Sequence, residues 1–145
     1  MDVQVPSKAF VWPIRVERDA IDAQGHASNV AILSWMNQAA WEHSRALGWD
    51  VAQYRELGGW FVVRRHEIDY HGRAMEGDAL QCMTWPTGLA KATAERRHVV
   101  IRPADQVVVA KGMNVWAYVD AESARPRRIP PALREAFDPA KFAES

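Results

Sequence analysis

"NVAILSWMNQAAWEHSRAL", residues 29–47, decides the fold because its pattern predicts one long helix. Side chains that can pack recur at spacings of three and four, so they share one helix face. They are Leu33, Met36, Ala40, His43 and Leu47, with Ile32, Ala39 and Ala46 widening the stripe. Gly48 follows at the expected helix end. Few positions are strongly polar on any face, so we expect a sheet to cover the helix on more than one side.

The rest of the chain predicts mostly strands. Segments rich in β-branched and aromatic residues lie at 9–16, 60–72, 78–86, 91–102 and 106–120. Short gaps between the later segments indicate antiparallel pairing. Short helices are expected after an Asp50 N-cap and near Pro131. One helix against about five strands predicts a single α+β domain over residues 1–145. Such a sheet leaves a face and two edges uncovered, so we expect self-association.

Two residues inside the expected strands have special backbone properties. Pro13 lacks an N–H group, which predicts that strand 9–16 is an edge strand or carries a bulge. Gly112 interrupts a run of β-forming residues in strand 106–120. A glycine there predicts either a bulge or the close approach of another part of the molecule.

Composition excludes several classes of protein. The 145 residues are 48% hydrophobic and 25% charged, which is typical of a globular domain rather than a disordered one. Eighteen basic and eighteen acidic side chains balance, so nothing indicates a nucleic-acid partner. The single cysteine, Cys82, rules out an intrachain disulfide. The pattern shows neither a signal peptide nor a membrane span, and we expect a cytoplasmic protein.

"ERDAIDAQGHASNVAIL", residues 17–33, holds the candidate reactive groups. Asn29 is the more natural N-cap, with Ser28 as a second candidate, whereas Asp22 lies seven residues before Asn29 and capping explains it poorly. Asp22 is either a structural residue of the loop or a general base or nucleophile near a helix N-terminus. His26 is either a turn residue or a second acid–base group, and an Asp22–His26 pair would suit hydration of a double bond. We expect Asp19 to be solvated.

Other chemical motifs are weaker. His43 is expected to be a packed core histidine and Glu42 a solvated residue. His66 and Glu67 point to opposite faces of their strand, which argues against a metal site there. The chain has no Gly-rich phosphate loop and no GxSxG elbow, and Cys82 lies in mid-strand, so a carboxylate is the best catalytic candidate.

Aromatic and basic residues indicate where a ligand would bind. Trp35, Trp41 and Trp60 suggest an apolar or aromatic pocket near the helix. Arginines cluster at 64–65, 96–97 and 125–128, with Lys91 beside the second group. Solvated strand faces explain such clusters, and so would phosphate binding if the clusters converge in space.

The chain resembles a known family along most of its length. "DAIDAQGHASNVAILSW" resembles the D-x-D-x-x-G-H-x-x-N signature of hotdog-fold acyl-CoA thioesterases of the 4-hydroxybenzoyl-CoA thioesterase type. "WEHSRALG", "GGWFVVRRHEIDYHGRAMEGDAL" and "YVDAESARPRRIP" resemble later segments of the same family in the same order. The resemblance implies a hotdog fold, with one long central helix wrapped by an antiparallel sheet. It also implies a dimer or tetramer with active sites at the dimer interface.

The resemblance also implies roles for single residues. Asp22 falls on the catalytic aspartate, Gly25 on the glycine of the tight turn, and the N–H group of Asn29 on the group that polarises the thioester carbonyl. Lys91 and Arg128 would hold the phosphates of coenzyme A. Some members use a helix glutamate instead, and this role would fall on Glu42. Asn37 departs from the family, since many relatives have an acidic residue near this position.

Together these features predict an acyl-CoA thioesterase that uses no cofactor and no metal. It would hydrolyse a thioester to a free acid and coenzyme A. Two alternatives remain open at the level of sequence. One is a hotdog enoyl-CoA hydratase or dehydratase that uses Asp22 and His26, and the other is a non-catalytic acyl-CoA-binding protein.

Overall fold

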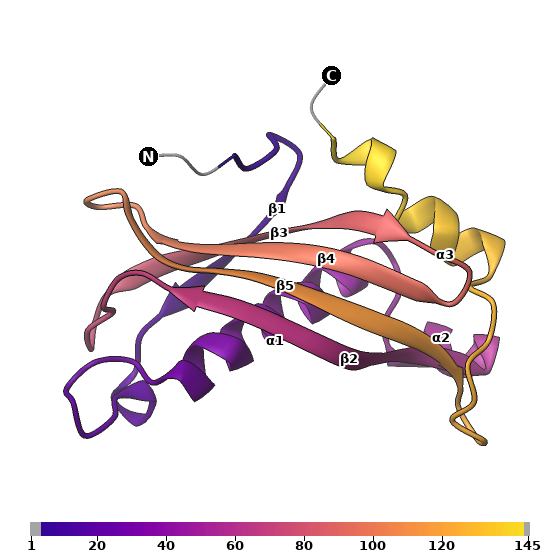
Figure 1. The fold of residues 1–145 in the computed structure, drawn as a ribbon, viewed down its shortest axis with the longest axis horizontal. Coiled ribbons are helices and arrows are strands. Elements are labelled where there is room, and N and C mark those ends of the chain that lie inside the picture. Colours follow the sequence, from indigo (N-terminus) through magenta and orange to yellow (C-terminus); the bar gives the residue numbers. More distant parts are fainter. Residues whose placement is uncertain (1–3, 144–145) are drawn as a thin grey trace.

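The computed structural model describes residues 4–143, which form one five-stranded antiparallel sheet with helices packed against it. The strands are β1 (Phe10–Arg15), β2 (Gly59–Tyr70), β3 (Ala79–Leu89), β4 (Thr93–Arg102) and β5 (Val107–Asp120). The helices are α1 (Asn29–Ala46), α2 (Val51–Leu57) and α3 (Pro131–Ala136), with short 3₁₀ turns η1 (Arg18–Ala20) and η2 (Pro139–Lys141). Figure 1 shows α1 lying along one face of the sheet.

The strand order is β1-β3-β4-β5-β2, so β1 and β2 are the two edges. β3, β4 and β5 follow one another as hairpins, which the short gaps in the sequence predict. The α+β class and the antiparallel sheet of about five strands are confirmed. Pro13 lies in the edge strand β1 and pairs in regular register with Gln81, so the edge position, rather than a bulge, accommodates its missing N–H group.

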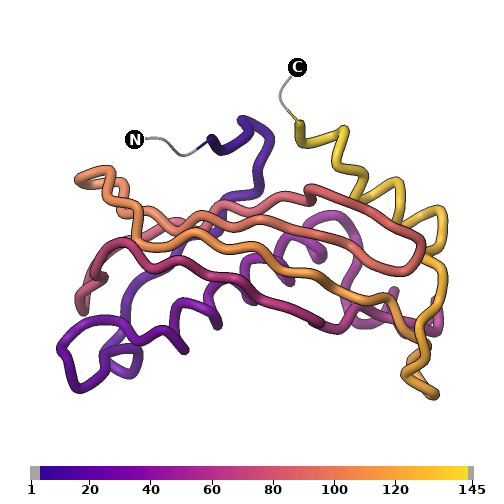
Figure 2. Tube along the Cα trace, viewed as in Figure 1, coloured from indigo at the N-terminus to yellow at the C-terminus, as the bar shows by residue number. Residues whose placement is uncertain are grey.

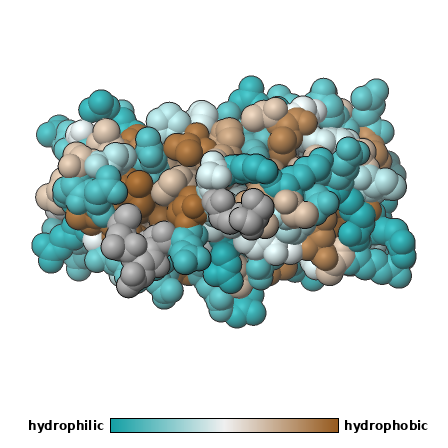
Figure 3. Space-filling view, turned by 90° about the horizontal axis from the view of Figure 1, so that it is seen from above, coloured by the Kyte–Doolittle hydropathy of each residue, from teal (hydrophilic) through white to brown (hydrophobic). Residues whose placement is uncertain are grey.

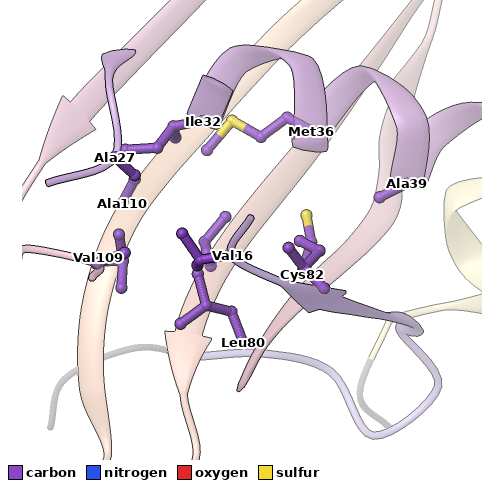
Figure 4. Close-up of a cluster of buried hydrophobic side chains, with 12 residues drawn as sticks. Val16, Ala27, Ile32, Met36, Ala39, Leu80, Cys82, Val109 and Ala110 are labelled. Carbon is purple, nitrogen blue, oxygen red and sulfur yellow. The ribbon is translucent and has the colours of Figure 1, made fainter. Parts of the chain in front are cut away.

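The main core lies between α1 and the sheet. Ile32, Met36 and Ala39 on α1 face the strand residues Leu80 and Cys82 across this core, and each of the five side chains is buried (Figure 4). The spacing of the three helix residues matches the stripe that the sequence predicts. Removing this apolar surface from water is the main favourable contribution to docking the helix.

Gly112 allows α1 to approach β5 closely. It keeps its place in the sheet register, opposite His98 on one side and Ile68 on the other, so no bulge forms. A Cβ atom at this position would lie 2.8 Å from Sδ of Met36. Of the two explanations that the sequence offers for this glycine, close approach is therefore the one observed.

A second core fills the end of the sheet where α2 and α3 pack, at the right of Figure 1. Tyr54 of α2, Tyr118 of β5 and Leu133 of α3 are buried together. Asp50 caps α2 through a capping box with Gln53, which confirms the predicted N-cap. Figure 3 shows the molecule from above, where hydrophobic patches lie among hydrophilic residues.

We expect Gly112→Ala to lower the free energy of unfolding by about 1–3 kcal/mol, because the new methyl group overpacks the buried Met36. Gly88→Ala is the control, since a Cβ atom there would meet Cβ of Glu95 at an ordinary 3.5 Å. Urea unfolding of the two variants and the parent protein measures the difference. Equal stability of the two variants would contradict this account of Gly112.

Candidate active site

The loop that carries Asp22 is folded by its own hydrogen bonds. The N–H group of Asp22 donates to the carbonyl of His26 (3.0 Å), and the N–H group of Gly25 donates to the carbonyl of Asp22 (3.0 Å). Oδ1 of Asp22 accepts from the N–H group of Gln24 (2.8 Å), which forms an Asx-turn. Among residues 4–143, the other carboxylate oxygen has no hydrogen-bond partner. Asp22 is half-buried, so the turn fixes the carboxylate while one oxygen stays available.

Gly25 and His26 complete this turn. Gly25 has a φ of +88°, a conformation that favours glycine, so the backbone explains this residue. Nδ1 of His26 lies 3.3 Å from the carbonyl of Ala27, which can only accept, so this nitrogen carries the proton. In the described part of the chain no hydrogen bond joins the side chains of Asp22 and His26. Within the described residues the two side chains are thus held by backbone groups of the turn and not by each other.

Backbone hydrogen bonds fasten the loop to the rest of the fold. The N–H group of Ala27 donates to the carbonyl of Ala74 (2.8 Å), and the N–H group of Ser28 donates to the carbonyl of Ala20 (2.9 Å). Both Ala27 and Ala74 are buried. The loop therefore holds the Asp22 turn at the start of α1 through contacts with the β2–β3 connection and with η1.

Ser28, and not Asn29, caps α1. Oγ of Ser28 accepts from the N–H group of Ala31 (3.1 Å), while Asn29 is the first helical residue and is exposed. The prediction of an Asn29 side-chain cap is wrong by one residue, because serine and asparagine cap equally well and stand side by side. Within residues 4–143 the N–H groups of Asn29 and Val30 have no acceptor. These two donors can polarise a carbonyl oxygen.

Glu42 lies far from this loop. Thirteen residues separate it from Asn29 along α1, a rise of about 20 Å. It accepts hydrogen bonds from Gln38 (3.2 Å) and Arg45 (3.0 Å), and its side chain is 16% exposed. The structure therefore shows Glu42 in an ion pair on the helix surface, and within one copy of the chain it does not join Asp22.

Lys91 and Arg128 lie together, but at the end of the sheet opposite to Asp22. The N–H group of Ile129 donates to the carbonyl of Lys91 (2.9 Å), which brings the two segments side by side. Both basic side chains are exposed. In Figures 1 and 2 the β3–β4 turn and the chain after β5 lie at the right, and the loop before α1 lies at the left. The predicted phosphate-binding residues and the predicted carboxylate are thus separated by the length of the sheet.

An apolar pocket of about 80 Å³ opens between the second half of α1 and the sheet. Trp41 and Trp60, which the sequence suggests as pocket residues, line it, with Trp116 and Phe61. Trp35 instead packs against the main core, so its predicted place in the pocket is wrong.

Arg96 also lines this pocket, and sequence analysis missed its role. It was grouped with Arg97 as one basic cluster, yet Arg96 is 7% exposed whereas Arg97 is exposed. Nη1 of Arg96 donates to Nδ1 of His43 (2.9 Å) and to Oγ1 of Thr84 (3.2 Å). Burial lowers the pKa of Arg96 to about 10, so the guanidinium is still charged at pH 7. The strand alternation that places Arg96, His98 and Val100 on one face was the available signal.

Two buried histidines lie near this guanidinium. His43 is packed in the core, as predicted. Burial and then the charge of Arg96 lower the pKa of His43, and likewise of His98, to about 3. Both imidazoles are therefore neutral at pH 7. Both ring nitrogens of His98, Oδ1 of Asn37 and Nδ2 of Asn114 are buried without a hydrogen bond of normal geometry in the described residues.

The described residues form neither a metal-binding cluster nor a membrane-spanning helix. In the part of the chain that the structure describes, no three His, Cys, Asp or Glu side chains are grouped closely enough to hold a metal ion. No helix between residues 4 and 143 has the length and apolar character to cross a membrane. Cys82 is buried, and burial raises the pKa of its thiol to about 12, which makes it a poor nucleophile.

Comparison with known proteins gives the family. Residues 8–137 match the acyl-ACP thioesterase N-terminal domain. The chain belongs to this family. It is a thioester hydrolase, so the thioesterase prediction is confirmed at that level. A search of curated protein sequences finds no match.

Solved structures of thioesterases and related proteins share the fold of this family member at low sequence identity. The SAV2348 protein of Staphylococcus aureus, solved in complex with CoA, has a TM-score of 0.87 and 10% identity, with 100% of this chain and 91% of that chain covered. The 1,4-dihydroxy-2-naphthoyl-CoA thioesterase of Synechocystis has a TM-score of 0.83 and 12% identity, covering 93% and 99%. A protein of Aquifex aeolicus has a TM-score of 0.81 and 20% identity, covering 88% and 98%. These likenesses support a hotdog-like α+β fold.

We expect the free energy of unfolding to fall as the pH is lowered from 7 to 5. The pKa values of His43 and His98 are about 3 in the folded protein, and an unfolded histidine titrates near 6.5, so the unfolded state binds more protons in this range. Each histidine contributes a loss of about 2 kcal/mol at pH 5. Urea unfolding across this pH range measures the slope.

His98→Gln should reduce this pH dependence by about half, because one of the two titrating groups is gone. His71→Gln is the matched control, since His71 is exposed after β2. The slope, rather than the absolute stability, is the quantity compared. An unchanged slope in His98→Gln would contradict the neutral, buried state of His98.

Proposed function

We propose that this thioesterase hydrolyses acyl-CoA thioesters, with Asp22 as the general base and the N-terminus of α1 as the donor to the substrate carbonyl. The observation that carries this proposal is the Asp22 carboxylate, which has one oxygen free of protein partners and is fastened to a helix start with two open N–H groups. A base and an oxyanion donor are the two groups that acyl transfer to water requires.

In this mechanism the free carboxylate oxygen of Asp22 takes a proton from a water molecule as the water oxygen attacks the thioester carbon. The N–H groups of Asn29 and Val30 stabilise the negative charge that develops on the carbonyl oxygen. The C–S bond then breaks, and the thiolate of coenzyme A receives the proton held by Asp22. The products are a free acid and a thiol. His26, with its Nδ1 proton on a backbone carbonyl, supports the turn that presents Asp22.

Coenzyme A is the carrier that the basic residues favour. Lys91 and Arg128 present exposed charges side by side, which suits the phosphates of coenzyme A. The CoA complex of the S. aureus protein and the naphthoyl-CoA thioesterase of Synechocystis show that proteins of this fold use such ligands. The 4-hydroxybenzoyl-CoA type that the sequence motif resembles is the finer assignment within this proposal.

Two copies of the chain would be needed to complete this site. The loop before α1, which carries Asp22, and the β3–β4 turn, which carries Lys91, lie at opposite ends of one protomer (Figure 2), so we expect the two parts of the site to come from different copies. β2 is an edge strand whose Val62 and Val63 are exposed, and such an edge is available for pairing. A dimer that places these ends against each other joins the two parts of the site.

Asp22→Asn should keep the fold and lower kcat for acyl-CoA hydrolysis by about 10²–10⁴-fold, because an amide cannot accept the proton of water. Asp19→Asn is the matched control, since Asp19 is an exposed aspartate in the neighbouring η1. Thiol release from short, long, branched and aromatic acyl-CoAs is the measurement. If Asp22→Asn released thiol at the parental rate, Asp22 would not be the base.

The double variant Lys91→Ala, Arg128→Ala should raise KM for acyl-CoA roughly tenfold, because two charge-assisted contacts to phosphate are lost. The same acyl group on pantetheine, which lacks the nucleotide, should show no change. Lys8→Ala, another exposed cation, serves as the control. Equal effects on both substrates would place the coenzyme A phosphates elsewhere.

A further inference from the structure

Arg96 is a buried cation with no anionic partner. Its guanidinium lines the apolar pocket and is 7% exposed, and no carboxylate between residues 4 and 143 forms a salt bridge with it. Its protein neighbours are neutral or aromatic: His43, Thr84 and the ring of Phe137, whose centroid lies 5.7 Å from Cζ. A buried ion without a counter-charge is costly, and proteins normally pair such ions.

Part of this guanidinium remains available for a ligand. Arginine has five N–H donors, and the two hydrogen bonds to His43 and Thr84 both come from Nη1. In the described residues Nε and Nη2 have no acceptor, which leaves three N–H groups. Nε and Nη2 together are the pair that binds a carboxylate through two parallel hydrogen bonds.

The residues that line the pocket indicate the shape and polarity of the rest of the ligand. They are mostly apolar and aromatic, with Trp41, Trp60, Trp116 and Phe61 among them. Glu95 also lines the pocket, and its carboxylate accepts a hydrogen bond from Oγ1 of Thr87 (2.6 Å). Trp41 is 39% exposed and Trp60 is 36% exposed, so the rim is open to solvent while Arg96 lies buried. The size of about 80 Å³ suits a compact group such as a single ring. Flat aromatic walls favour a planar body, which can stack on them.

We propose that this pocket binds a small organic acid, whose carboxylate pairs with Arg96 and whose apolar, planar body stacks among the tryptophans. Within one copy of the chain the site is separate from the Asp22 loop, since Ala40 in the pocket wall lies eleven residues along α1 from Asn29, a rise of about 16 Å. The ligand is a free acid, because a thioester carbonyl carries no negative charge with which Arg96 could form an ion pair. A thioester hydrolase releases organic acids, so ligands of this class arise at its own active site.

The test compares charged and neutral ligands of the same shape. Benzoate and benzamide, and hexanoate and hexanamide, are titrated into the intact protein, and binding is followed by calorimetry and by tryptophan fluorescence. We expect benzoate to bind about tenfold to a hundredfold more tightly than benzamide, and more tightly than hexanoate. No saturable binding up to millimolar concentrations, or equal affinity for acid and amide, would overturn the proposal.

Variants then locate the site. Arg96→Met keeps most of the side-chain volume and should abolish the preference for benzoate over benzamide, whereas Arg97→Met, one residue along β4 and exposed, should keep it. Retained preference in Arg96→Met would overturn the proposal. Should Arg96→Met fail to fold, Trp41→Ala at the rim should weaken both ligands to the same degree. An unchanged affinity in Trp41→Ala would exclude this pocket.

These measurements are independent of hydrolysis. Binding of benzoate with loss of activity in Asp22→Asn supports both proposals. Benzoate binding together with full activity in Asp22→Asn rejects only the role of Asp22. Thiol release by the parent protein, together with equal affinity for benzoate and benzamide, rejects only the proposed acid-binding site.

Discussion

The close packing of α1 on the sheet is the constraint on which the other features depend. Met36 on α1 packs directly on Gly112 of β5, and any side chain at position 112 would push the helix away from the sheet. Because the helix is held this close to the sheet, the loop that carries Asp22 is fixed at its N-terminus. The second half of the helix forms one wall of the apolar pocket. The two candidate functional regions are thus two ends of a single helix–sheet interface, and their separation follows from the length of α1.

The same interface buries polar groups as well as apolar ones. Arg96 is buried there in its charged form, and burial, together with the charge of Arg96, keeps His43 and His98 neutral. If both histidines were protonated, three positive charges would repel one another in a small volume. Arg96 keeps its charge, and the two histidines are therefore neutral. Burying Arg96 costs stability that methionine or leucine would not cost. The proposed carboxylate ligand would supply the counter-charge that the protein neighbours of Arg96 do not.

Local patterns in the sequence predict the helices and strands well, but they do not predict the contacts between them. The stripe of residues on α1 and the strand segments are correct to within a few residues, because hydrophobic periodicity reflects burial directly. The N-cap was misplaced by one residue because Ser28 and Asn29 have similar capping strength. Arg96 and Arg97 look equivalent as neighbours in sequence, yet the pleat turns one into the core and the other outward.

The relation between Asp22 and the Lys91–Arg128 pair shows what no local pattern contains. Both sets of residues fit one reaction, and sequence alone gives no reason to separate them. The strands decide the matter: β4 has ten residues, so it spans about 30 Å, and the two sets lie at its opposite ends. In the proposed function, a substrate contacted by both sets would lie between two copies of the chain. The proposed function and the exposed edge strand β2 thus point to self-association on independent grounds, one from the placement of the site residues and one from unpaired backbone groups.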